Sequence, residues 1–211
     1  MSRMSRHLVL FLASGTTGAA FYWGFAAADP MTRFSMASAY AGLFLLALTL
    51  TIGPWNKLRG NANPISSYLR RDIGIWAGIL GIVHIIVGLQ VHMGGKFWLY
   101  FLPPPDATYH FPLRIDPFGL TNYAGLAAGL LLLMLLMLSN NASLRALGAA
   151  RWKNLQRWNY AIAALVAAHG VVYQLLEKRA MGFVLLFGAA VALACAFQIA
   201  GYAVARKKVG L

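Results

Sequence analysis

The sequence has few acidic residues and almost no cysteine. Asp and Glu together number 5 and Cys 1 among 211 residues, against 18 Lys and Arg. The one cysteine, Cys195, excludes a disulfide framework within the chain. Charged residues make up only 11% of the sequence, whereas 60% are hydrophobic. A water-soluble domain of this length needs more polar surface to cover its core, so the composition excludes a soluble protein.

Long apolar runs are what the chain has in abundance. A helix needs about 20 apolar residues to cross a bilayer, and six such runs occur, at 8–28, 34–53, 73–93, 119–138, 158–176 and 180–204. Asp29-Pro30 and Gly53-Pro54 are expected to end the first two helices, because proline stops a helix. We therefore predict an all-α, polytopic membrane protein, with six transmembrane helices in a bundle that forms one domain over 1–211.

The first apolar run has some features of a secretory signal peptide. Basic residues precede it and three alanines, 26–28, end it. It is longer than the apolar core of a signal peptide, so we interpret it as the first membrane helix. The hydrophilic segments are too short for a nucleotide- or flavin-binding domain, and we expect soluble redox steps to need a separate partner protein.

The basic residues predict the orientation of the helices. A net charge of +13 would suggest nucleic acid as a partner of a soluble protein, but here the charges lie in short loops between apolar runs. With the N-terminus inside, thirteen of the 18 basic residues fall on the inner side, and the outer side holds only Arg33, Lys96, Arg114, Lys178 and Arg179. The positive-inside rule therefore predicts cytoplasmic N- and C-termini in a bacterial-type inner membrane, with lipid and not nucleic acid as a partner.

Two histidines lie deep within the predicted helices, where ionisable residues mark functional sites. His84 follows Arg71 by 13 residues, and His169 follows Arg157 by 12. A helix rises 1.5 Å per residue, so the histidines lie about 20 Å and 18 Å from the inner helix ends. Both helices run outward, and the two imidazoles can face each other at one level. That arrangement is typical of the axial ligands of a b-type haem.

Other interpretations of these residues remain open. Gly81 and Gly88 share the helical face of His84, and their missing side chains would leave a slot for a flat macrocycle. Small residues also let membrane helices pack closely, which explains the glycines without a cofactor. Either histidine alone is compatible with an interhelical hydrogen bond or a proton relay. A zinc or copper site would need further ligands at this depth, and the sequence offers none.

Two stretches resemble the ferric reductase-like transmembrane domain family. Leu69-Arg70-Arg71-Asp72-Ile73-Gly74-Ile75, followed by His84, is similar to the third helix of that family, and Leu155-Gln156-Arg157-Trp158, followed by His169, is similar to its fifth. In style the chain is closest to the haem-binding membrane subunits of periplasmic methionine sulfoxide reductase systems. The resemblance implies six helices with cytoplasmic termini, and a haem as cofactor.

The chain departs from the family at the inner haem site. Family members place further histidines there, where this sequence has Gln156 and Arg70. Neither side chain is a suitable haem ligand, so the resemblance implies one haem b, in the outer half of the membrane, with His84 and His169 as its metal ligands.

A single outer haem leaves a gap on the cytoplasmic side of the membrane. Candidate contacts to a quinone, a flavin or a partner protein there are Arg70, Arg71, Gln156 and Arg157, although such arginines also serve simply to set topology. His92 follows His84 by 8 residues. It is a candidate partner of a haem propionate or a quinone, or a residue that faces the outer headgroups.

The leading hypothesis is an electron-transfer subunit of an oxidoreductase, with no catalytic residue of its own. It would pass electrons through the haem between a quinol or cytoplasmic flavin donor and an outer acceptor. The alternative is a structural or assembly subunit of a larger membrane redox complex that keeps the fold without catalysis. A transporter is disfavoured, because no carboxylate lies in the middle of a predicted span.

Overall fold

The computed structural model describes residues 2–26, 29–60, 64–104 and 111–209, with the backbone alone at 64–67 and 207–209. Within these ranges all regular structure is helical, which confirms the all-α prediction. The elements are α1 (Arg3–Gly24), α2 (Pro30–Leu58), α3 (Pro64–Gly88), the 3-10 turn η1 (Phe97–Tyr100), α4 (Pro117–Leu138), α5 (Asn141–Gln156), α6 (Asn159–Leu176) and α7 (Met181–Val209).

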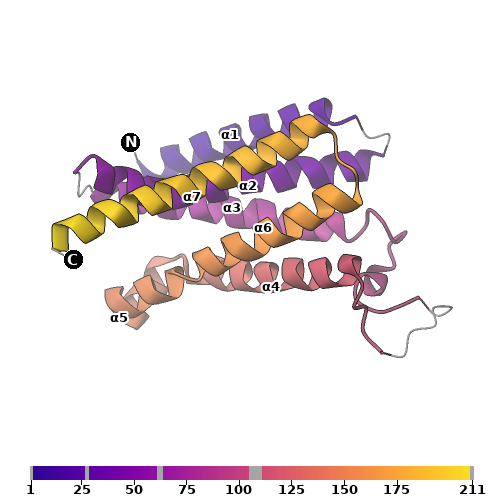
Figure 1. Ribbon diagram of the computed structural model, residues 1–211. Helices are drawn as coiled ribbons and strands as arrows, with labels where there is room; N and C mark the ends of the chain where they lie inside the picture. The colour runs from indigo at the N-terminus through magenta and orange to yellow at the C-terminus, as the bar shows by residue number, and fades with distance from the viewer. Residues whose placement is uncertain (1, 27–28, 61–63, 105–110, 210–211) are drawn as a thin grey trace.

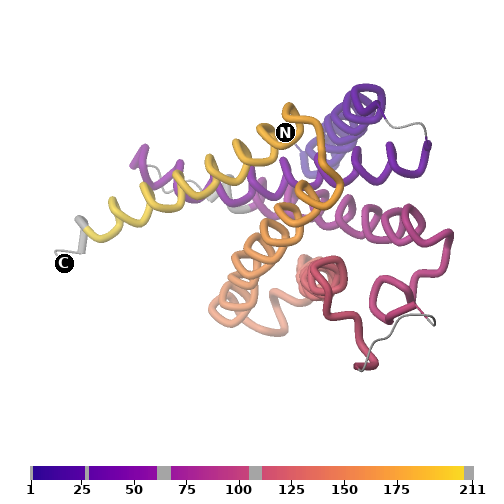
Figure 2. Tube along the Cα trace, turned by 45° about the vertical axis from the view of Figure 1, so that its right-hand side comes forward, coloured from indigo at the N-terminus to yellow at the C-terminus, as the bar shows by residue number. Residues whose placement is uncertain are grey.

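The long helices form a bundle with both chain ends at the same end (Figure 1). We call this the inner end and the opposite one the outer end, following the predicted orientation. Helix α2 lies at the centre and contacts α1, α3 and α7, while α4 packs on α6. The α4–α6 pair lies to one side of the other helices, and α6 and α7 diverge toward the inner end (Figure 2).

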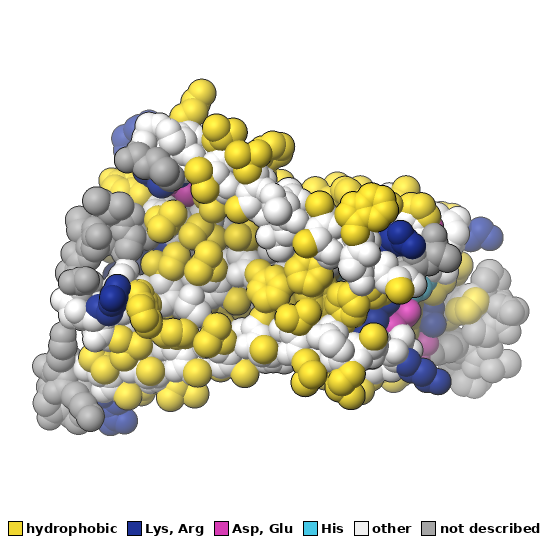
Figure 3. Space-filling view, turned by 90° about the horizontal axis from the view of Figure 1, so that it is seen from above, with side chains coloured by type: hydrophobic (Ala, Val, Ile, Leu, Met, Phe, Trp, Pro, Cys, Tyr) yellow, Lys and Arg dark blue, Asp and Glu magenta, His cyan; other side chains and the backbone are white. Residues whose placement is uncertain are grey.

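The surface of the bundle is that of a membrane protein. Apolar side chains cover the middle of the face in Figure 3, and the basic side chains gather toward its two ends. Among the residues that the structure describes, five segments are long and apolar enough to cross a bilayer; they lie in α2, α3, α4, α5 with α6, and α7. Helix α1 is not among them, although its 22 residues extend about 33 Å. The chain is therefore polytopic, and the count of six spans stays a prediction.

Helix α2 passes through Pro54, so the prediction that Gly53-Pro54 ends it is wrong. Proline lacks the N–H that would bond the carbonyl four residues earlier, here that of Leu50. The Gln198 side chain of α7 donates to this carbonyl instead, at 2.6 Å. Gly201 allows the approach, because a Cβ there would lie 2.7 Å from the Cβ of Pro54. A contact from another helix thus stabilises the proline within α2.

Three other boundaries differ from the predictions. The first helix ends at Gly24, while 27–28 lie outside the described residues. Asp29 caps α2 by accepting from the Thr32 amide at 2.8 Å, and does not end the first helix. Helix α3 begins at Pro64 and ends at Gly88, whereas 73–93 was predicted. The segment 139–157, which lies between two of the predicted spans, contains α5, which is bent at Gly148 with φ 72°.

A buried carboxylate joins the inner ends of α1 and α3. Asp72 of α3 is 0% exposed, and it accepts a hydrogen bond of 2.8 Å from the Arg6 guanidinium of α1. The His7 Nε2 atom lies 3.5 Å from the same carboxylate, and Trp76 donates to His7 Nδ1 at 3.2 Å. These contacts hold the inner end of α1 against α3 and fix the position of α1 along the axis of α3.

Candidate functional site: a cavity between two histidines

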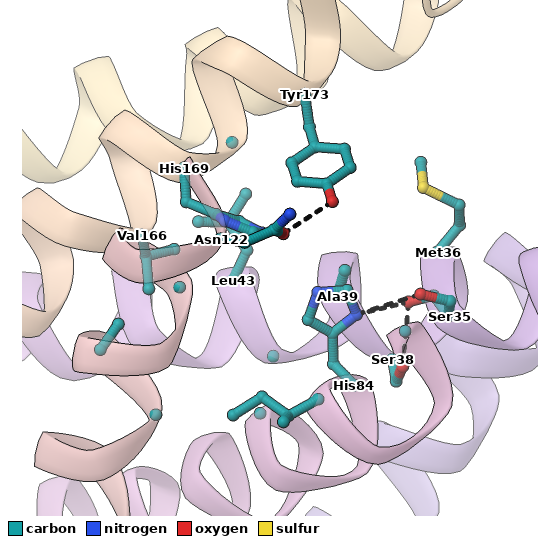
Figure 4. A pocket seen from close by; sticks show the side chains of 18 of the residues that line it. Ser35, Met36, Ser38, Ala39, Leu43, His84, Asn122, Val166, His169 and Tyr173 are labelled. Atoms are coloured by element: carbon teal, nitrogen blue, oxygen red, sulfur yellow. Dashed lines mark hydrogen bonds between the residues drawn. The ribbon is translucent and has the colours of Figure 1, made fainter. Parts of the chain in front are cut away.

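A cavity of about 470 Å³ lies between α2, α3, α4 and α6. This volume is in the usual range for ligand pockets. His84 of α3 and His169 of α6 face the cavity from opposite sides (Figure 4). Their ring centroids are 6.4 Å apart, and the ring planes make an angle of 76°. The structure therefore brings together the two residues that the sequence predicted to lie at one level.

Both imidazoles are oriented by main-chain carbonyls. His84 Nδ1 lies 3.0 Å from the Ser35 carbonyl oxygen of α2, and His169 Nδ1 lies 2.9 Å from the Thr121 carbonyl oxygen of α4. A carbonyl only accepts hydrogen bonds, so Nδ1 carries the proton in each ring. Each Nε2 is left with a lone pair, as in a histidine prepared to bind a metal.

Gly125 makes the second of these contacts possible. It lies one turn after Thr121 in α4, and a Cβ on it would come within 2.8 Å of His169 Nδ1. The glycine is therefore needed for the close approach of the imidazole to α4. Sequence analysis did not identify Gly125. Its spacing of four from Gly129, on one face of the helix, is the signal that would have pointed to a close approach there.

The predicted glycines and His92 line the same cavity. A Cβ on Gly88 would lie 3.8 Å from His84 Cε1, and one on Gly81 would lie 3.1 Å from Leu132 of α4. Gly88 thus adjoins the imidazole, whereas Gly81 makes room for a neighbouring helix. His92 lies beyond the end of α3, at the outer end of the cavity. Its Nε2 is 3.4 Å from the Glu177 carboxylate, and a quarter of its side chain is exposed.

The four inner candidates lie apart from this cavity and are not among its lining residues. Arg71 donates to the Asn141 side chain of α5 at 2.9 Å. Gln156 Nε2 is buried without a partner among the described residues. Arg70 and Arg157 are exposed. The structure thus separates an inner group of polar residues from the histidine cavity.

The spacing of the two imidazoles suits one metal ion between them. Metal–imidazole bonds are about 2 Å long, so two opposed rings on one ion have centroids about 6 Å apart. Within the described part of the chain, no group of three or more His, Cys, Asp or Glu side chains could hold an ion. A metal here would need to bring its other ligands, as the iron of a haem does.

Comparison with known proteins identifies the family. The chain is 31% identical to the protein-methionine-sulfoxide reductase haem-binding subunit MsrQ of Ralstonia nicotianae over 162 residues. The aligned region covers 77% of this chain and 67% of that protein. The chain belongs to the MsrQ family. The MsrQ of Azospira oryzae is 32% identical over 152 residues, or 72% of this chain. The resemblance to haem-binding subunits of methionine sulfoxide reductase systems is thereby confirmed.

The similarity covers only part of some relatives. This chain spans 58% of the length of the Azospira MsrQ. It is also 32% identical over 127 residues to the magnetosome protein MamZ of Magnetospirillum gryphiswaldense, covering 60% of this chain but 17% of MamZ. No family model matches the chain.

Several polar residues at the outer end of the cavity of this MsrQ-family chain were missed by sequence analysis. Tyr173 lies one turn after His169 on α6 and donates to the Asn122 side chain of α4 at 2.9 Å (Figure 4). Gln174 donates to Tyr40 of α2 at 2.9 Å. Tyr173 could have been found from its spacing to His169, whereas Asn122 and Tyr40 depend on which helices are neighbours.

Proposed function

We propose that this chain is a membrane b-type cytochrome that binds one haem b between His84 and His169. The observation that carries the proposal is the pair of opposed imidazoles, 6.4 Å apart at their centroids, with both Nδ1 atoms on carbonyl oxygens. Haem iron, when bound, takes up and releases one electron at a time. The names of the MsrQ relatives, which are haem-binding subunits, support the same cofactor.

The residues of the chain hold the two ligands ready. The carbonyls of Ser35 and Thr121 fix Nδ1 as the protonated nitrogen of each neutral ring and orient both rings at the cavity, which leaves Nε2 without a proton. Since no side-chain proton has to leave before the metal binds, coordination is favoured at neutral pH. Apolar groups of Leu46, Leu132 and Val166 line the inner part of the cavity and exclude water from the ligands.

The proposed site lies in the outer half of the bilayer. His84 is only four residues before the end of α3, and His169 is seven before the end of α6, whereas both helices extend further on the inner side. The distribution of basic residues supports cytoplasmic termini in an inner membrane. With this orientation, the haem would be nearer to an outer acceptor than to the cytoplasm.

We further propose that electrons enter from a quinol or a cytoplasmic flavin donor and leave to a separate protein on the outer side. The reductase named for the relatives acts on protein methionine sulfoxide, and it is the proposed acceptor system. Arg70, Arg71, Gln156 and Arg157 at the inner end are the proposed contacts to a flavin, a quinone or a donor protein. The buried Gln156 Nε2, which has no partner within the described part of the chain, supports a polar ligand near this end.

The experiment is a reduced-minus-oxidised visible spectrum of the purified chain, with haem quantified per chain. We expect one low-spin b-type haem in the wild type and none in His84→Ala or His169→Ala. His7→Gln is the control, because His7 lies at the inner end on Asp72 and Trp76, and it should keep the full spectrum. A full low-spin spectrum in His169→Ala would contradict the ligand assignment.

The alternative function is a structural subunit of a larger redox complex. Gln156 and Arg70 in place of the family's inner ligands favour this alternative. A folded protein that binds no haem, even when haem is supplied during expression, would select it.

A further inference from the structure

The outer end of the cavity contains a buried amide donor that has no partner among the described residues. Asn122 is 7% exposed, and its Oδ1 accepts the hydrogen bond from the Tyr173 hydroxyl. This contact fixes the orientation of the amide, so Nδ2 is the atom left for another partner. Among the described residues Nδ2 has none. A buried donor of this kind needs an acceptor, because leaving it unsatisfied costs about 1–3 kcal/mol.

A nearly buried cation lies at the same end of the cavity. Arg179, in the turn between α6 and α7, lines the cavity, and its side chain is only 13% exposed. The closest carboxylate, that of Glu177, is 3.9 Å away, and the guanidinium stacks on Phe25 at 5.1 Å. Burial lowers the pKa of Arg179, although an arginine remains charged at neutral pH. The Glu177 carboxylate therefore neutralises the Arg179 charge only weakly, and the guanidinium can bind a further anion.

The two ends of the cavity thus differ in polarity. The inner part is lined by Leu46, Leu132 and Val166, and the outer part by the Asn122 amide and the Arg179 guanidinium. A haem has the same asymmetry, since both its carboxylates project from one edge and the opposite edge is apolar. Carboxylates only accept hydrogen bonds, and the groups available at the outer end are donors.

We propose that Asn122 and Arg179 bind the two carboxylates of the haem, with its apolar edge toward the inner end of the cavity. This inference rests on the proposed function. Asn122 and Arg179 act as positioning residues, because they set the orientation of the macrocycle and not the ligation of the iron. The Arg179 charge also stabilises the less positive, reduced state of the cofactor, and so raises its midpoint potential.

The first test measures midpoint potential and haem release in two single variants. In Arg179→Gln we expect a lower midpoint potential, and haem transfer to an acceptor apoprotein at least about tenfold faster, since a hydrogen bond to a charged group is lost. Lys178→Gln is the matched control: it removes an exposed charge from the same turn and should match the wild type in both measurements. Equal potentials in the two variants would overturn the role of Arg179.

The second test changes the cofactor, so its main comparison, haem against ester in the wild type, does not depend on the folding of a variant. Wild-type protein is loaded with haem or with its dimethyl ester, in which both carboxylates are blocked. We expect the ester to leave the wild type at least about tenfold faster than haem, and to leave Asn122→Leu/Arg179→Gln at the same rate as haem. Equal release of haem and ester from the wild type would overturn the proposal.

The same measurements separate this proposal from its alternatives. If Arg179 bound an anion from the outer solution instead, added phosphate would shift the wild-type potential and the ester would behave like haem. That result would overturn the assignment to haem carboxylates. A wild type without haem would refute the proposed function itself. If His84→Ala lost the haem, but neither Arg179→Gln nor the ester changed potential or release, this inference alone would be refuted.

Discussion

Gly125 offers a direct test of how the cavity is built. In the structure, a Cβ on Gly125 would lie 2.8 Å from Nδ1 and 2.9 Å from Cε1 of His169. The imidazole cannot give way without losing its hydrogen bond to the Thr121 carbonyl. Gly125→Ala adds only one methyl group, but it should displace His169, one of the two proposed haem ligands.

The matched control is Gly188→Ala in α7, where an added Cβ would have no neighbour within 4 Å. Replacing glycine by alanine within a helix stabilises it by about 0.8–1 kcal/mol, and this gain should be seen in full at Gly188. At Gly125 it is opposed by an overpacking cost of about 1–3 kcal/mol and the loss of a hydrogen bond of about 1 kcal/mol. The expected net effect of Gly125→Ala is a destabilisation of about 1–3 kcal/mol.

A third variant tests the reason for this difference. At Gly129, an added Cβ would contact the terminal Cδ1 of Ile85, which can move by changing rotamer. Gly129→Ala should therefore have an effect between those of the other two variants, within about 1 kcal/mol of the wild type. Its haem affinity should fall by less than that of Gly125→Ala, because Gly129 and Ile85 line the cavity but the added Cβ contacts neither histidine.

The assay has two readouts, thermal unfolding of the haem-free protein in detergent and titration of that protein with haem. Loss of the carbonyl contact to a ligating histidine lowers metal affinity about 10–100-fold, and we expect a loss of this order in Gly125→Ala. If Gly125→Ala matched Gly188→Ala in both stability and haem affinity, the packing of His169 against α4 would be refuted.

Two further predictions concern the bundle itself. Asp72→Asn removes the buried carboxylate that Arg6 contacts at 2.8 Å, and should destabilise the protein by about 3 kcal/mol, measured by thermal unfolding; an unchanged transition would show that the contact between α1 and α3 carries little stability. Gln198→Leu leaves the Leu50 carbonyl next to Pro54 without its donor, and should cost about 0.5–2 kcal/mol while leaving haem content unchanged. A loss of haem in Gln198→Leu would contradict the separation of this contact from the cavity.

The depth of the two histidines could be predicted because helical rise is constant. The distances from Arg71 to His84 and from Arg157 to His169 follow from residue counts alone, and they place both rings at one level whatever the details of packing. For His92 a residue count along the helix does not apply, because the third helix, predicted to run to residue 93, ends at Gly88. The chain leaves the helix there, and His92 contacts Glu177.

The partners of the histidines could not be predicted in this way. The carbonyls of Ser35 and Thr121 belong to α2 and α4, and every residue of a helix has a carbonyl, so no pattern in the sequence distinguishes these two. Pro54 is a similar case. Its position predicts the end of a helix, and only the donor from Gln198 on α7 explains why α2 continues.

The sequence by itself determined that this chain is a helical membrane protein with two histidines at matched depth, because apolar length and residue spacing act locally along the chain. Only the tertiary structure decided what surrounds those histidines. Which helices adjoin α3 and α6, where Gly125 permits a close approach, and which end of the cavity carries Asn122 and Arg179 depend on contacts between residues far apart in the sequence, and these are set by how the whole bundle packs.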